Sequence, residues 1–263
     1  MVRDAGQEKA GAQNPEKRRI HSMDELRGFA VLCMIFYHGF YTLAYLYGID
    51  WGMALLRFFM PAEPFFAALF ILISGVSSDL SRSNLKRGLK LLAVALAVTL
   101  VTGLIVPSEI ITFGILHFLS ICMILFGLCK KQLDKLPFSW VWIALCALAY
   151  FLTMNITRGY LGIGAFSLPL PQVWYEQGWL FPFGICSSSF RSSDYFPLFP
   201  WIFVFLAGTM LGRFAAQGRF PAFLYPSRIP ALSWMGRHAL ILYIIHQPVI
   251  YGAAWIIDLC ISR

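Results

Sequence analysis

Charge is the property this sequence has least of. Only 13% of its 263 residues are charged, against about 25% in an average soluble protein. In contrast, 59% are hydrophobic and the mean hydropathy is +0.68. The shortage of charge excludes a soluble globular domain. The apolar runs are nearly continuous, which excludes a membrane β-barrel, whose strands alternate over segments of about ten residues. We therefore predict an all-α polytopic membrane protein.

Motifs for metal binding are also missing. The six cysteines show no CxxC spacing, and the histidines form no HxxxH or HxxE arrangement, so the sequence predicts no metal site. Most of the cysteines lie inside apolar segments, where cysteine acts as a small hydrophobe, and a bridge between Cys186 and Cys260 is left open. No repeat of 20 to 50 residues and no inverted pair of broken helices is visible, which weighs against a transporter.

The apolar runs predict seven membrane-spanning helices. We place them at residues 26–46, 63–80, 88–106, 113–129, 137–155, 197–214 and 239–258. Residues 1–21 are polar and are predicted to form a disordered cytoplasmic tail. Residues 22–260 then form one transmembrane domain, and its longest connection, 156–196, is rich in glycine, proline and aromatic residues. A connection of that length is typical of a lid, a binding loop or a re-entrant cover.

The basic residues predict the orientation of these spans. All but four of the 21 lysines and arginines fall on the side of the N-terminus, and the exceptions are Arg57, Arg158, Arg191 and Arg263. Because positive charge gathers on the cytoplasmic side, the N-terminus is predicted to be cytoplasmic, and the C-terminus and the loop 156–196 external. The net charge of +8 is explained by these short loops, so we predict no binding of nucleic acid. Gly75, Gly208 and Gly212 are predicted to allow close helix packing.

The first span carries ionisable side chains within an apolar helix. At helical spacing Asp24, Arg27 and His38 fall on one stripe, with roughly 16 Å between the last two along the axis. Ionisable groups inside a membrane are costly and therefore mark candidate sites. Asp24 and Arg27 also fit a simple ion pair at a helix start, and that reading stays open.

Other polar groups are predicted to share the middle and outer part of the bundle. His117, His246 and Gln247 come from two further spans at depths comparable to His38, so a common polar cavity is predicted. A histidine can act as general base or carry an acyl group if a partner orients its ring. Glu63 and Asp194 are the candidate partners on the outer side, although each also fits a solvated helix start.

Several sequence blocks resemble a known family. The ten residues between Arg27 and His38 resemble the R-x10-H signature of membrane-bound acyltransferase family three. The blocks MDELRGFAVLCMIFYH, FILISGVSSDLSRS, ITFGILHFLSICMILF, DYFPLFPWIFVFLAGTMLGR and GRHALILYIIHQPV follow one another in order. Together they are similar to bacterial relatives of heparan-alpha-glucosaminide N-acetyltransferase over about residues 18–258.

The resemblance implies a transmembrane acyltransferase of the bacterial cytoplasmic membrane. It would move an acetyl group from cytoplasmic acetyl-CoA to an extracytoplasmic glycan or amino-sugar acceptor, by N- or O-acetylation. His38 would be the catalytic base or acyl carrier, oriented by Asp194 or Glu63. The residues expected toward the coenzyme and its cavity are Arg27, Asp24, Arg87, Arg237, His117, His246 and Gln247.

Two alternatives and the oligomeric state remain open at this stage. A small-solute transporter would use the histidines as a proton relay, and a redox subunit would use them to hold haem. Association of several copies in the lipid bilayer is not decided by the sequence.

Overall fold

The fold is a bundle of membrane-length helices, shown by a computed structural model that describes residues 19–261, with side chains as far as Ile256. Seven helical segments in that range are long and apolar enough to cross a membrane, namely His21–Tyr45, Asp50–Asp79, Asn84–Ile105, Ile115–Leu133, Trp140–Arg158, Leu198–Ala216 and Ala239–Ile256. The predicted count of seven spans is confirmed. Most of the predicted tail, residues 1–18, and the side chain of Cys260 lie outside the described part, so those expectations stay predictions.

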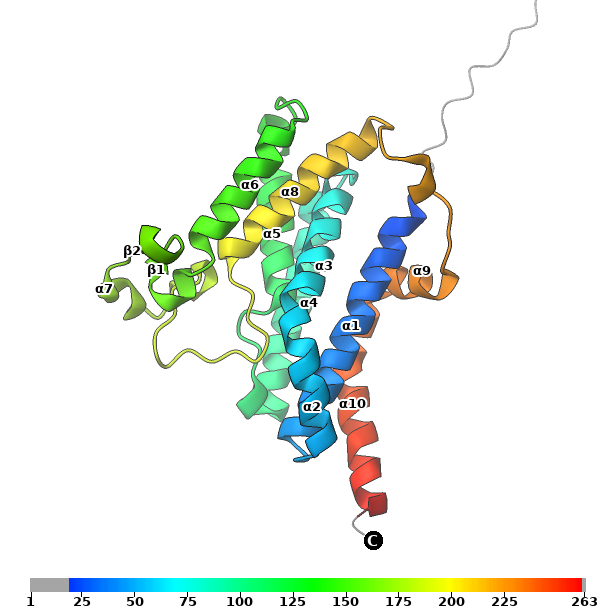
Figure 1. Cartoon of the computed structure of the whole chain (residues 1–263), viewed down its shortest axis with the longest axis vertical. Helices are drawn as coiled ribbons and strands as arrows, with labels where there is room; N and C mark the ends of the chain where they lie inside the picture. Colours follow the sequence, from blue (N-terminus) through cyan, green and yellow to red (C-terminus); the bar gives the residue numbers. More distant parts are fainter. Residues whose placement is uncertain (1–18, 262–263) are drawn as a thin grey trace, which may run out of the picture.

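The spans are formed by seven long helices, several of which are joined by short elements (Figure 1). The long helices are α1 His21–Tyr45, α3 Glu63–Asp79, α4 Asn84–Ile105, α5 Ile115–Leu133, α6 Trp140–Thr153, α8 Leu198–Ala216 and α10 Ala239–Ile261. The short elements are α2 Asp50–Phe59, η1 Met60–Ala62, η2 Pro107–Glu109, η3 Ile156–Arg158, β1 Tyr160–Leu161, η4 Gly164–Phe166, β2 Leu168–Pro169, α7 Gln172–Tyr175, η5 Phe181–Phe183, η6 Ala222–Leu224 and α9 Pro230–Arg237.

Helix α2 is an element that apolar runs alone do not reveal. The second span is predicted to begin at residue 63, whereas the structure has a continuous 30-residue segment from Asp50 through η1 to Asp79. Pro61 and Pro64 suggest a break, but each stands in the first turn of a helical element. A proline there loses no hydrogen bond, so the helix passes through them. Gly48, with φ of 64°, makes the turn from α1 into α2.

Glycines let α3 and α8 approach each other closely, as predicted. A Cβ atom on Gly75 would overlap the backbone of Phe205, and one on Gly208 would overlap the backbone of Leu72. The core beside this contact comes mainly from α5 and α8, through side chains that include Phe118, Phe126 and Phe205. Gly212 meets Asp79 in the same way, so all three glycines have the packing role that the sequence analysis assigned to them.

Helix α9 packs against α1 and is capped by a buried carboxylate. One oxygen of Glu25 accepts hydrogen bonds from the backbone N–H groups of Arg228 and Ile229, at 2.6 and 2.9 Å. The hydroxyls of Ser227 and Ser233 donate to the same oxygen at 3.2 and 3.4 Å. A negative charge at a helix N-terminus satisfies the free N–H groups and the helix dipole. Glu25 therefore fixes α9 onto α1, from about 200 positions earlier in the chain.

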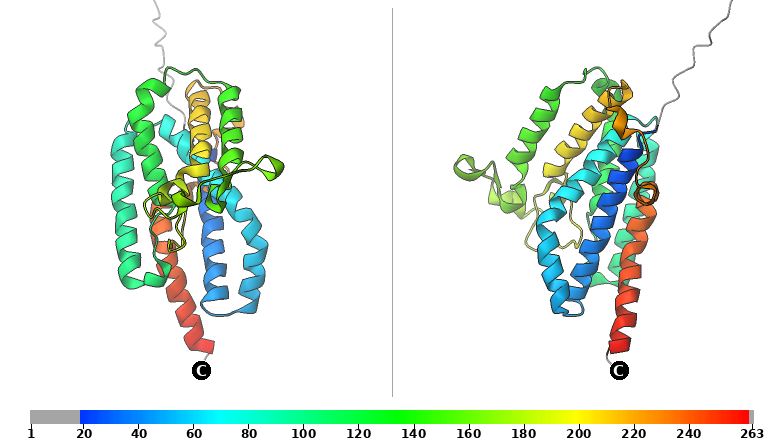
Figure 2. Two further views of the ribbon diagram at one scale, coloured as in Figure 1. Left: turned by 90° about the vertical axis from the view of Figure 1, so that its left-hand side faces the viewer. Right: turned by 45° about the vertical axis from the view of Figure 1, so that its right-hand side comes forward.

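The connection between α6 and α8 has two parts. Residues 159–180, which contain β1, η4, β2 and α7, stand away from the bundle at one end of α6 in Figure 1 and in the right-hand view of Figure 2. Residues 191–196 instead return to the bundle and bond to residues 109–115. Ser193 N–H donates to Ile110, Phe196 N–H donates to Phe113, and Ser192 Oγ accepts from Thr112 N–H. This second part carries Asp194 to the start of α5.

Candidate functional site: a basic cavity and a histidine pair

A cavity of about 1610 Å³ opens at the end of the bundle where α1 begins. Helices α1, α3, α4, α5, α9 and α10 and the turn after α8 form its walls. Its cationic lining residues are Arg19, Arg27, Arg82, Arg87, Lys90 and Arg237. Asp24 is the only acid among the described residues that line it. So strong an excess of positive charge in a concave site suits a ligand with several negative charges.

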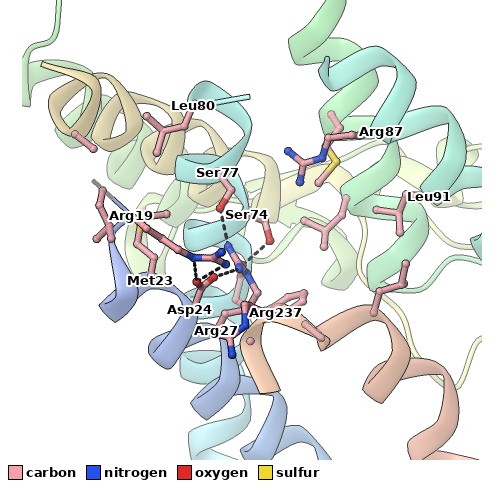
Figure 3. A pocket seen from close by; sticks show the side chains of 18 of the residues that line it. Arg19, Met23, Asp24, Arg27, Ser74, Ser77, Leu80, Arg87, Leu91 and Arg237 are labelled. Atoms are coloured by element: carbon pink, nitrogen blue, oxygen red, sulfur yellow. Dashed lines mark hydrogen bonds and ion pairs between the residues drawn. The ribbon is translucent and has the colours of Figure 1, made fainter. Parts of the chain in front are cut away.

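Asp24 holds two of these arginines. Its carboxylate accepts from Arg19 Nε at 2.8 Å and from Arg27 Nη1 at 3.0 Å. Arg27 Nη2 also donates to Ser77 Oγ at 2.6 Å, which ties α1 to α3. Figure 3 shows this group on one wall of the cavity, with Arg87 facing it from α4. The predicted pair of Asp24 and Arg27 is thus a real ion pair, and it also belongs to the cavity.

The deeper wall of the cavity is apolar. It is lined by Phe70 from α3, Leu91 and Val94 from α4, Leu116, Leu119 and Met123 from α5, and Leu240 from α10. Tyr243, one turn further along α10, also lines the cavity. The cavity thus combines a charged mouth with an apolar interior, so the best ligand is anionic at one end and weakly polar at the other.

Tyr243 connects the cavity to Asp194. The phenol donates to Asp194 Oδ2 at 2.5 Å, and the same oxygen accepts from Ile115 N–H at 3.0 Å at the N-terminus of α5. Burial raises the pKa of the Asp194 carboxyl above its ordinary value, and the bonds from Tyr243 and Ile115 oppose that rise. A side chain on Gly114 would collide with this carboxylate, so glycine is required there.

His38 and His246 lie together one turn beyond Tyr243. Their ring centroids are 5.0 Å apart. His246 Nδ1 is 2.6 Å from the carbonyl oxygen of Tyr243, and a carbonyl can only accept, so this nitrogen carries the proton. The Nε2 atom of His246 is then an unprotonated base, and it is buried without a hydrogen-bond partner.

Gln247 sets the opposite tautomer on His38. The amide Nε2 of Gln247 lies 3.1 Å from His38 Nδ1 and can only donate to it. The proton of neutral His38 therefore sits on Nε2, which makes that atom a hydrogen-bond donor. The two rings thus offer one acceptor and one donor in close proximity, an arrangement suited to moving a proton.

The remaining predicted residues have other surroundings. His117 Nδ1 accepts from Gly114 N–H at 3.2 Å in the turn before α5, and its Nε2 lies 3.2 Å from Thr99 Oγ1 of α4. Tyr243 is among the residues around this histidine. Glu63 lies at the start of α3, near enough for electrostatic repulsion with Asp194, but no hydrogen bond joins the two carboxylates. Within the described residues, no group of three or more His, Cys, Asp and Glu side chains is placed to hold a metal ion.

A comparison with known proteins identifies the family. A family model described as heparan-alpha-glucosaminide N-acetyltransferase, catalytic, matches residues 19–248. The chain belongs to this family. No curated protein and no solved structure matches it. Membership in the heparan-alpha-glucosaminide N-acetyltransferase catalytic family, together with the seven spans, indicates a membrane acetyltransferase. The matched residues contain both the basic cavity and the histidine pair.

The structure places most of the predicted site residues of this N-acetyltransferase family member in two groups, apart from His117 and Glu63. Asp24, Arg27, Arg87 and Arg237 line the cavity. His38, His246, Gln247 and Asp194 lie beyond it, and Tyr243 joins the groups. Sequence reasoning missed Tyr243, although its position three residues before His246 places both on one helix face. It also missed the cavity roles of Arg19 and Lys90, because basic residues near a helix end are equally explained by orientation of the span.

Proposed function

We propose that the protein transfers an acetyl group from acetyl-CoA, bound in the basic cavity, to an extracytoplasmic acceptor. The observation that carries the proposal is the cavity itself, which is cationic at its mouth, apolar inside and closed by Tyr243 next to the histidine pair. The distribution of Lys and Arg supports placing its mouth on the cytoplasmic side, as for a protein of the bacterial inner membrane. Cytoplasmic acetyl-CoA would then reach it directly.

The cavity fits the chemistry of this donor. Arginine binds phosphate through paired N–H groups, so the 3′-phosphate and 5′-diphosphate of coenzyme A would lie among Arg27, Arg87 and Arg237. The pantetheine arm is weakly polar and would extend along Leu91 and Leu116 toward Tyr243. The thioester would then approach His246, which lies about one helical turn, or ~5 Å, further along α10, and His38, which faces it from α1.

The tautomers define the roles of the two histidines. We assign the general base to His246, because its Nε2 is free to accept a proton, and the donor role to His38, because its Nε2 carries one. In this scheme His246 takes the proton from the acceptor amine or hydroxyl as that atom bonds to the acetyl carbon. His38 Nε2–H donates a hydrogen bond to the oxyanion. The C–S bond then breaks as the carbonyl re-forms, and the proton held by His246 passes to the coenzyme thiolate.

The acceptor would approach from the other side of the membrane. Asp194 and Glu63 lie toward that side, and the family suggests a glycan or amino sugar with a free amine or hydroxyl. Such an acceptor needs polar contacts and a base but no charge transfer across the bilayer. The acetyl group would cross while the coenzyme stays on the cytoplasmic side.

Binding of the donor tests the proposal most directly. We expect the purified protein in lipid nanodiscs to bind acetyl-CoA and to release coenzyme A when an amino sugar is added. The double variant Arg87→Gln, Lys90→Gln removes two exposed cations of the cavity and should weaken binding about tenfold or more, the equivalent of about 1.4 kcal/mol.

Lys131→Gln provides the matched control, since Lys131 is exposed at the end of α5 but does not line the cavity. Its affinity for acetyl-CoA should equal that of the wild type. Absence of binding to the wild-type protein would refute the donor assignment. Equal losses in the two variants would show a general charge effect instead of a site.

A further inference from the structure

The segment 159–180, called here the projecting loop, is an exposed apolar feature between the spans that the proposed reaction does not use. We propose that this loop lies in the membrane–water interface beside α6, with its apolar tip among the lipids, as an interfacial anchor. The loop follows α6, the fifth long helix of the bundle, and extends sideways from it in Figure 1 and in the right-hand view of Figure 2. This role is independent of the acetyltransferase reaction.

The composition of the projecting loop is unlike that of a water-exposed loop. No charged residue occurs between Gly159 and Tyr175, and Glu176 is the only one between Arg158 and Arg191. Loops in water depend on polar and charged side chains, because their surface is solvated. A segment with so little charge matches the interfacial region, where apolar and aromatic side chains gather.

Its large apolar side chains point outward instead of packing onto the bundle. Phe166 is 90% exposed, Trp179 67% and Leu168 64%. Ile163, Val173 and Trp174 are also exposed. Exposed apolar side chains in this number would be unfavourable in water and usually mark a contact with lipid or protein. Immersion in lipid removes this cost, because the side chains leave water.

The position of the loop favours lipid over a second protein as its partner. The preceding span, Trp140–Arg158, has 19 residues, about the number that crosses the hydrocarbon core. The projecting loop begins directly after it, where a span of that length would reach the membrane–water interface. The outward face of α6 carries exposed Val141, Leu148 and Phe151, so the apolar surface of the loop continues a surface that already faces lipid. Trp140 and Trp174 then occupy opposite interfaces, as in an aromatic belt.

Internal hydrogen bonds make the loop suited to this environment. Gly162 N–H donates to Leu152 at 2.6 Å, Asn155 Nδ2 donates to Gly162 at 2.9 Å, and Leu170 N–H donates to Gly159 at 2.8 Å. Strands β1 and β2 pair antiparallel, and the Tyr175 hydroxyl donates to the backbone of Ile156. Backbone groups near lipid must find partners within the protein. These bonds supply several of them and fix the loop to the end of α6.

Tryptophan quenching by brominated lipid tests the proposal. Phe166→Trp introduces a fluorophore at the loop tip, and the protein is reconstituted at one copy per nanodisc with phosphatidylcholine brominated on its acyl chains. The emission added by the new tryptophan, relative to wild type, is measured in brominated and ordinary lipid. Leu104→Trp serves as the lipid-facing control on α4, and Lys135→Trp as the aqueous control.

We expect the tryptophan at position 166 to lose fluorescence in brominated lipid to the same extent as the one at position 104, while that at 135 loses none. Quenching no greater than at position 135 would overturn the proposal. If the added emission is unquenched in single-copy discs but shifts to shorter wavelength as protein concentration rises in detergent, the loop contacts a second copy. That result would also overturn lipid as its partner.

Discussion

The Tyr243 phenol donates a 2.5 Å hydrogen bond to Asp194, and this bond joins the cavity helix α10 to the segment that precedes α8. Asp194 at the same time caps α5 through Ile115. A single carboxylate thus holds together three parts of the bundle around the histidine pair. Its ionisation state therefore affects both stability and the geometry of the site.

Replacement of Asp194 by asparagine should change how stability depends on pH. The pKa of Asp194 is raised above 3.8 by burial, so the folded protein favours the neutral carboxyl. This contribution is present below pH 3.8 and is lost as pH rises through the folded-state pKa. The melting temperature of wild type minus that of Asp194→Asn should therefore fall as pH increases from about 4, and then become constant. Thermal unfolding of both proteins in nanodiscs at several pH values measures this difference in melting temperature.

A difference that rises with pH would contradict this prediction, because it would mean that the folded state favours the carboxylate. Tyr243→Phe gives a useful comparison, since it removes the hydrogen bond that favours the ionised form. In that variant the fall should extend to higher pH than in the wild type.

The two histidines are expected to respond differently to substitution. His246→Gln removes the buried free base, so kcat should fall by about 10²–10⁴, the usual contribution of a general base. His38→Gln removes only a donor, and its kcat should fall less, by about 10². The rate of coenzyme A release by the purified variants measures both kcat values. The KM for acetyl-CoA should stay near that of the wild type, because neither histidine lines the cavity.

His238→Gln is the control for this pair, because His238 lies at the junction of α9 and α10, away from His38. It should keep near wild-type kcat. If His38→Gln proves the more damaging of the two active-site changes, the assignment of base and donor is reversed.

Asp24 is expected to compete with the donor for its arginines. In the structure its carboxylate occupies Arg19 and Arg27, which a phosphate group would otherwise contact. Asp24→Asn keeps the shape and removes the charge, so the affinity for coenzyme A should increase about fivefold, roughly 1 kcal/mol. Ser77 continues to hold Arg27 in that variant. Calorimetry at low and high salt measures the change, which should shrink as salt increases. A weaker affinity would show that Asp24 mainly orients Arg27.

The seven spans, most of their approximate ends and the glycine contacts between α3 and α8 were predictable, because each depends on local composition and helical periodicity. The start of the second span was not, because Pro61 and Pro64 suggest a break where the helix continues. The cluster of Asp24 and Arg27 was predictable for the same reason. Helix α9 was not, since its capping carboxylate comes from Glu25, far away in the sequence. The tautomers of His38 and His246 could not be predicted from the sequence either. The tautomer of His38 depends on its contact with Gln247, and that of His246 depends on the backbone carbonyl of Tyr243, and both contacts exist only in the folded protein.

Glu25→Gln should detach α9 from α1 at modest cost to the rest of the fold. The carboxylate accepts from two backbone and two hydroxyl groups at the start of α9, and a neutral amide loses both the charge and part of this capping. Bonds to a charged acceptor contribute about 1.5–3 kcal/mol, so the melting temperature should fall measurably. Hydrogen exchange should increase in residues 227–237 and not in α5. Ser227→Ala removes one of the four donors and should show a smaller effect in the same region. Uniform exchange over the whole bundle would mean that Glu25 supports global stability instead of α9 alone.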